Sequence, residues 1–135
     1  NQMSKFYPIA KYLMMKGELD LTSVPIIASL VNDTYVYSDA HTSMDESVSS
    51  SVVRSVNVNH VSVGDPSGNP GYGVFDCDNL NMLEVPTGHN VNGLVFYSVD
   101  TPILYLNGGV GLPFVSSGGD VEINFSNGTN RVAKL

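Results

Sequence analysis

Tryptophan is absent from this chain of 135 residues, and cysteine occurs once, as Cys77. A single cysteine excludes an intrachain disulfide framework and a zinc site built from a cysteine cluster. Charge is also scarce, because charged residues make up 14% of the sequence, against about 25% in an average soluble domain. No run approaches the ~18 consecutive apolar residues that a transmembrane helix requires, so none is predicted.

Basic residues are the scarcest of the charged residues. Six lysines and arginines stand against thirteen aspartates and glutamates, which gives a formal net charge of −7. A nucleic-acid-binding protein needs basic side chains along the phosphates, and a protein that docks on an anionic membrane needs a basic patch. We therefore predict neither nucleic-acid binding nor membrane binding.

The start of the sequence, Asn1-Gln2-Met3-Ser4, lacks the basic region and apolar run of a signal peptide. Because cysteine is also nearly absent, we expect synthesis in a reducing cytoplasm. The length suits one domain, which we place over residues 1–135.

One helix is predicted, over about residues 4–16. Ile9, Tyr12 and Leu13 have the spacing of an apolar stripe, and Gly17 is suited to the position just after the helix. From about residue 24 onward the chain consists of short apolar or alternating segments separated by turns. These segments are residues 24–31, 56–63 with a bulge near 59–60, 74–80, 91–99, 102–106, 121–125 and 131–135.

Short strands at this spacing predict a mainly β protein, a single antiparallel β-sandwich or barrel-like domain with one short N-terminal helix. The last two segments, joined by a turn at residues 126–129, are typical of a hairpin that buries Val121, Ile123 and Phe125. Residues 38–51 are polar and rich in serine, which predicts a long exposed loop with one helical turn at 43–47.

Side chains that could carry chemistry are few. His41, His60 and His89 have no ligand partner at metal-binding spacing. The segment Asp76-Cys77-Asp78-Asn79 could supply oxygens to calcium, but the alternative of a strand edge is favoured because the EF-hand pattern fails. Two flanking aspartates would raise the pKa of Cys77, so it is expected to be an inert, inward-facing thiol. We predict no catalytic, cofactor-binding or metal-binding residue and no enzymatic activity.

Candidate contact residues lie in two parts of the chain. The predicted helix carries more apolar side chains than one stripe needs, and methionine and aromatic residues are common in protein interfaces. The alternative is that all of them belong to the domain core. The candidate interface residues are Phe6, Tyr7, Met14 and Met15 from the helix, and Ser38, Asp39, His41, Met44 and Asp45 from the polar loop.

Several segments in order resemble a known group of proteins. They are residues 16–21, 26–31, 73–76, 91–100, 111–114 (Gly-Leu-Pro-Phe), 118–123 and 127–135. This order resembles small virion structural proteins of tailed bacteriophages, of the head-decoration or capsid auxiliary type. The resemblance implies a β-rich virion protein; its motifs specify a fold rather than a site, and no catalytic residue is carried over from that group.

Three functions follow as hypotheses. The first is a decoration or cement protein that binds the assembled shell through the major capsid protein or other virion proteins, as a homo-oligomer with a trimer as the expected form. The second is a tail, neck or fibre component. The third, less favoured because tryptophan is absent, is a carbohydrate-binding module. The expected location is the virion.

Overall fold

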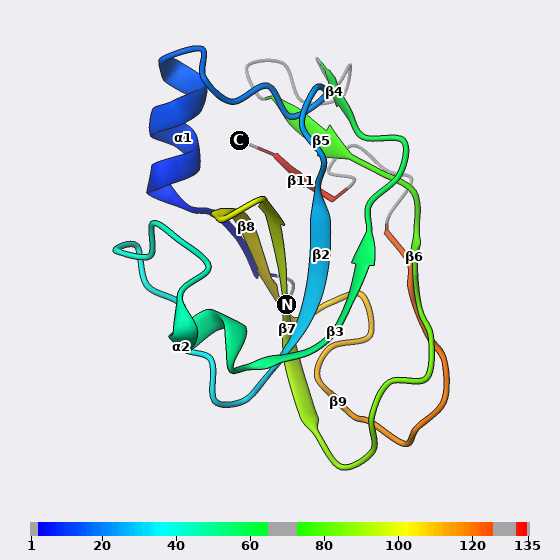
Figure 1. Ribbon diagram of the computed structural model, residues 1–135. Helices are drawn as coiled ribbons and strands as arrows, with labels where there is room; N and C mark the ends of the chain where they lie inside the picture. The colour runs from blue at the N-terminus through cyan, green and yellow to red at the C-terminus, as the bar shows by residue number, and fades with distance from the viewer. Residues whose placement is uncertain (1–2, 65–72, 126–131, 135) are drawn as a thin grey trace.

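The computed structural model describes residues 3–64, 73–125 and 132–134, which form antiparallel sheets and two short helices (Figure 1). The largest sheet is called the main sheet below. Its strands lie in the order β1 (Met3–Phe6), β8 (Thr101–Asn107), β7 (Asn90–Ser98), β2 (Ile27–Asn32) and β3 (Val52–Asn57), and β9 (Phe114–Val115) also pairs with β7. The strands predicted at 91–99 and 102–106 are confirmed as β7 and β8, and both are buried along most of their length.

Two smaller sheets form a second layer. One contains β4 (Ser62–Gly64), β5 (Val74–Asp76) and β11 (Ala133–Lys134), and the other contains β6 (Leu80–Met82) and β10 (Val121–Ile123). The inner core joins this layer to the main sheet; its members include Leu30, Leu94 and Phe96 on the main sheet and Phe75 and Ile123 opposite. The prediction of a mainly β, antiparallel, sandwich-like fold is confirmed, and the described strands do not close a barrel.

A second, smaller core, called the outer core below, covers the opposite face of the main sheet. It consists of Tyr7, Val31, Tyr35, Val48, Val95 and Tyr105. The segment that follows β2 crosses this face and carries α2 (Glu46–Ser49), which lies beside the main sheet in Figure 1. The predicted polar loop is therefore only partly exposed, because Val48 and Ser51 are buried, and its helical turn lies slightly later than predicted.

Helix α1 (Pro8–Met15) is shorter than predicted. Residues 4–6 belong to β1, which pairs with β8, so the predicted start at residue 4 is wrong. The reason is local, since the residue before a proline is driven to extended conformations, and Tyr7 has φ −65° and ψ 138°. The predicted end is confirmed: Gly17 has φ 75°, and its N–H donates to Met14 O at 3.1 Å.

Two predicted strands are each divided between two sheets. Residues 56–63 contain the end of β3 and most of β4, which belong to different sheets, so the single strand with a bulge is wrong. His60 lies at the corner with φ 55°. Residues 74–80 divide in the same way into β5 and the start of β6, so Asp76 and Asp78 do not share one strand face.

The predicted C-terminal hairpin is also wrong. Strand β10 pairs with β6, whereas β11 pairs with β5 in another sheet. The predicted turn at 126–129 lies outside the described residues. The prediction that Val121, Ile123 and Phe125 face the core is confirmed, because Ile123 and Phe125 are buried and Val121 packs against the same core. The alternation of apolar and polar residues along a strand determines which of its faces is buried, but it does not specify which strand it pairs with.

Candidate functional site

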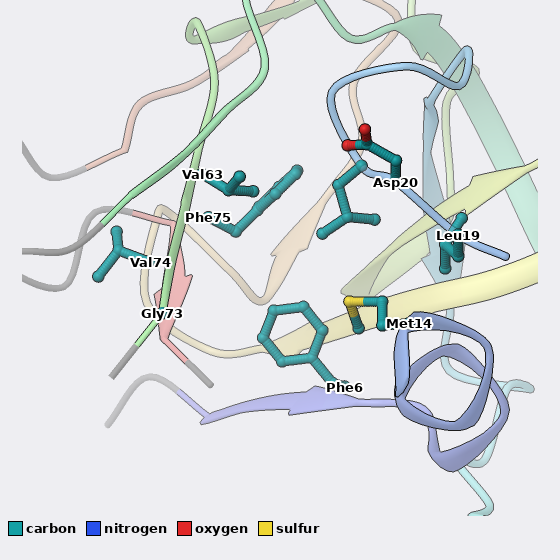
Figure 2. A pocket seen from close by; sticks show the side chains of 9 residues that line it. Phe6, Met14, Leu19, Asp20, Val63, Gly73, Val74 and Phe75 are labelled. Carbon is teal, nitrogen blue, oxygen red and sulfur yellow. The ribbon is translucent and has the colours of Figure 1, made fainter. Parts of the chain in front are cut away.

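An apolar pocket of about 320 Å³ opens between α1, the segment after it and the sheet of β4 and β5 (Figure 2). It is lined by Phe6, Met14, Leu19, Asp20, Leu21, Val63, Gly73, Val74 and Phe75. Asp20 is the one charged residue among the described lining residues, and its carboxylate points away from Phe6 and Met14 in Figure 2. That carboxylate accepts hydrogen bonds from Thr22 Oγ1 at 2.7 Å and Ser23 Oγ at 3.0 Å.

The hydrogen bonds from Thr22, then Ser23, hold the pKa of Asp20 below its usual range. The carboxylate is thus occupied by its own turn, so the inside of the apolar pocket offers contact surface rather than polar chemistry. Its side chains suit insertion of an apolar group.

The candidate interface residues of the predicted helix lie in different surroundings in the structure. Phe6 and Met14 both line the apolar pocket, although Phe6 is almost fully buried. Tyr7 has no exposed surface, which corrects its place among the interface residues. It belongs to the core because β1 turns into α1 at this point, against Ile103, whose carbonyl accepts the Tyr7 N–H at 2.9 Å. Met15 is 89% exposed.

Three of the loop candidates organise a cluster of tyrosines. Asp39 Oδ1 accepts the Tyr37 hydroxyl at 2.7 Å, and His41 Nδ1 lies 2.9 Å from the Tyr35 hydroxyl. Ser38 turns the chain between these partners: its Oγ accepts the Ala40 N–H at 3.1 Å, and its carbonyl accepts the His41 N–H at 3.1 Å. The hydrogen bond from Tyr37 lowers the pKa of Asp39.

The tyrosine rings pack against one another on the outer face of the main sheet. Tyr37 is stacked on Tyr105 with ring centres 5.5 Å apart, and Tyr7 lies 4.9 Å from Tyr37. Lys5 Nζ lies 5.0 Å from the centre of the Tyr37 ring. Because Tyr37 has Tyr7, Tyr105 and Lys5 as close neighbours of its ring, it does not stand as the open aromatic platform that a sugar site uses. Asn92 borders a cavity beside the cluster, and its Oδ1 accepts no hydrogen bond within the described chain.

The remaining loop candidates border a second opening, of about 330 Å³, called the hairpin groove below. It is lined by Met44, Ser49, Val52, Tyr97, Val99 and Asp100. Asp45 is adjacent and stabilises the start of α2, where its Oδ1 accepts the Val48 N–H at 3.3 Å. Of these residues, Met44 and Asp45 are candidates predicted from the sequence, and Ser49 lies in the same predicted loop. The missed signal is the turn at 99–100, which joins two strands without glycine or asparagine.

The apolar pocket and the hairpin groove lie on opposite faces of the main sheet. Phe6, Leu19 and Phe75 of the apolar pocket belong to the inner core. The hairpin groove is instead bordered by Val52 and Tyr97, which pack against the outer core. The candidate interface residues from the helix and from the loop are therefore not brought together into one site.

The oxygen-bearing side chains of residues 76–79 do not converge on one point, because they have different partners. Asp78 Oδ2 lies 2.5 Å from His60 Nδ1, whereas Asn79 Oδ1 accepts the Phe125 N–H at 2.9 Å. Within the described ranges no group of three metal-ligating side chains occurs. Cys77 points inward as predicted, and burial, with smaller contributions from Asp76 and Asp78, raises its pKa to about 12.

Comparison with known protein families, with curated proteins and with solved structures returned no match to this chain. In the part of the chain that the structure describes, neither helix is long and apolar enough to cross a membrane.

Proposed function

We propose that this chain is a non-enzymatic structural protein of a tailed bacteriophage, which binds the assembled capsid and bridges neighbouring shell subunits. One observation carries the bridging role: among the described residues, the apolar pocket and the hairpin groove lie on opposite faces of one sheet, and apolar side chains contribute to the lining of each. A cement protein needs two such surfaces, because it must contact two subunits at once. The phage assignment rests on the resemblance of the strand-and-turn segments.

Weak contacts are sufficient for this role. When two contacts are made by one rigid body, the second is effectively intramolecular, and avidity exceeds either affinity by about 10²–10⁴. The low charge of the chain favours the same role, since the buried centres of interfaces are depleted of charged residues. A homo-oligomer, a trimer in particular, would add further contacts on a shell with three-fold positions. The proposed location is the virion.

Sedimentation with empty shells tests the proposal. The shells are assembled from the major capsid protein encoded in the same genome, and the purified chain should sediment with them. Val63 is half-exposed at the rim of the apolar pocket, so Val63→Ser should weaken binding by at least about ten-fold. Leu83→Ser is the matched control, because Leu83 is similarly exposed and borders neither opening. A wild-type chain that stays in the supernatant would contradict the proposal.

The second hypothesis, a tail, neck or fibre component, is an alternative outcome of the same experiment. A chain that does not sediment with empty shells but sediments with purified tails would support it. Carbohydrate binding is the least favoured function, because the tyrosine rings are packed together instead of standing open.

A further inference from the structure

Val99 occupies a backbone conformation that does not suit it. It is one of the two residues between β7 and β8, where Ser98 pairs with Thr101, and its φ is 55°. Tight hairpin turns with positive φ favour glycine, asparagine and aspartate. A β-branched residue in this region is a steric outlier, so the conformation of Val99 is strained.

Packing within the described chain does not offset this strain. The Val99 side chain is 84% exposed, so it gains little from the hydrophobic effect. A strained residue with an exposed apolar side chain is better explained by a contact outside the chain, since strain is often retained where it serves function.

The surroundings of Val99 form a prearranged groove. The Met44 N–H lies within hydrogen-bonding distance of two Asp100 acceptors, the carbonyl at 2.9 Å and Oδ1 at 3.1 Å, which ties the loop to the hairpin. Ser49 Oγ donates to the Met44 carbonyl at 3.0 Å, and the fully buried Val48 anchors α2 to the outer core. The walls are thus held in place before a partner binds, which lowers the entropic cost of association.

The side chains of the groove indicate the chemistry of its occupant. Met44, Tyr97 and Val99 offer an adaptable and partly aromatic surface. Asp100 is exposed, and among the described residues that line the groove it is the one charged residue, with no basic one beside it. An apolar side chain next to lysine or arginine complements this combination of surface and charge.

We infer that the hairpin groove binds a segment of a shell subunit in which an apolar side chain is flanked by lysine or arginine, with Val99 as the central contact. This inference rests on the proposed function and deepens it, because it names one of the two contact surfaces and the chemistry of its partner. The backbone strain at Val99 in the free chain is then offset by the contact that its side chain makes in the particle.

The substitution Val99→Asn separates strain from binding, because asparagine tolerates positive φ and is not apolar. The melting temperature should stay the same or rise, while affinity for empty shells falls by at least about ten-fold. The control is Val115→Asn, since Val115 is also well exposed but lies on β9, outside the groove; it should bind as the wild type does. Asp100→Asn keeps an oxygen for the Met44 N–H and should make binding less sensitive to salt.

Each outcome is informative. Val99→Asn binding as tightly as wild type would overturn the inference while the proposed function stands. A lower melting temperature for Val99→Asn would overturn the strain argument on which the inference is built. Failure of the wild type to bind shells would overturn the proposed function and the inference together. Reversible dimers of the purified chain that Val99→Asn abolishes, seen by analytical ultracentrifugation, would identify a second copy as the occupant and overturn the inference.

Discussion

The ring of Tyr105 packs directly against the backbone of Gly93. A Cβ atom at residue 93 would lie 2.6 Å from Tyr105 Cε1, closer than nonbonded carbon atoms approach. Tyr105 is in turn stacked on Tyr37, so the ring has little freedom to move away. The absence of a side chain at Gly93 is what allows the tyrosine cluster to lie on the main sheet.

Gly93→Ala should therefore destabilise the protein by about 1–3 kcal/mol, the usual cost of overpacking a core. Urea denaturation followed by circular dichroism measures this change in the free energy of unfolding. Gly119→Ala is the control, because a Cβ there meets no atom within 4 Å and Gly119 has no positive φ. Equal stability of Gly93→Ala and wild type would contradict the close approach of the ring.

The paired hydroxyls of Tyr7 and Tyr35 predict a second effect on stability. They lie 2.5 Å apart in the outer core, and Tyr7 is fully buried. Tyr7→Phe removes one hydroxyl and should cost about 1–2 kcal/mol, because the remaining hydroxyl loses a buried partner. Tyr12→Phe, at a half-exposed position, should change the stability by less than about 0.5 kcal/mol. A smaller loss for Tyr7→Phe than for Tyr12→Phe would show that the pair is not a stabilising contact.

The same burial predicts how stability depends on pH. Burial, with further contributions from Tyr35, raises the pKa of Tyr7 above its ordinary value of 10.0. At high pH the folded chain keeps the Tyr7 phenol proton after the unfolded chain has lost it. The contribution of Tyr7 to the free energy of unfolding is therefore full below pH 10.0 and is lost as the pH rises further. Denaturation at several pH values should show this fall, and it should be smaller in Tyr7→Phe. A stability that stays constant above that pH would be inconsistent with a buried Tyr7.

Cys77 predicts a protected thiol. Its pKa is raised from 9.0 to about 12 by burial, so the nucleophilic thiolate is scarce near neutral pH. A disulfide reagent such as Ellman's reagent should react slowly with the native protein at pH 8 and rapidly after unfolding in urea. Rapid reaction of the native protein at that pH would place Cys77 at the surface.

Local patterns in the sequence predicted the central strands β2, β7 and β8 of the main sheet, whereas β1 was placed in the helix and β9 was not predicted. Strands β7 and β8 are apolar on both faces, because the main sheet carries a core on each side, and that pattern is readable without a structure. Pairing in the second layer was not predictable in this way. Strands β10 and β11 have good hairpin spacing, yet each pairs with a different strand, because contacts between distant segments decide the partner.

The candidate site was predicted less completely than the fold. Met14 and Met44 each line an opening, and their place in an interface stays a prediction. Tyr7 could not be separated from them by composition, because its burial depends on β1 pairing with β8. Val99 was missed because it ends an apolar run that predicts a strand, whereas its significance lies in its positive φ and its exposure.

Cryo-electron microscopy of the virion at side-chain resolution tests the bridging role most directly. If the chain bridges shell subunits, its density will lie at repeated positions over the shell, with the apolar pocket against one capsid subunit and the hairpin groove, including Val99, against its neighbour. The chain found only as a single ring at the neck or tail, or absent from the particle, would contradict it. So would a chain on the shell with both openings facing solvent.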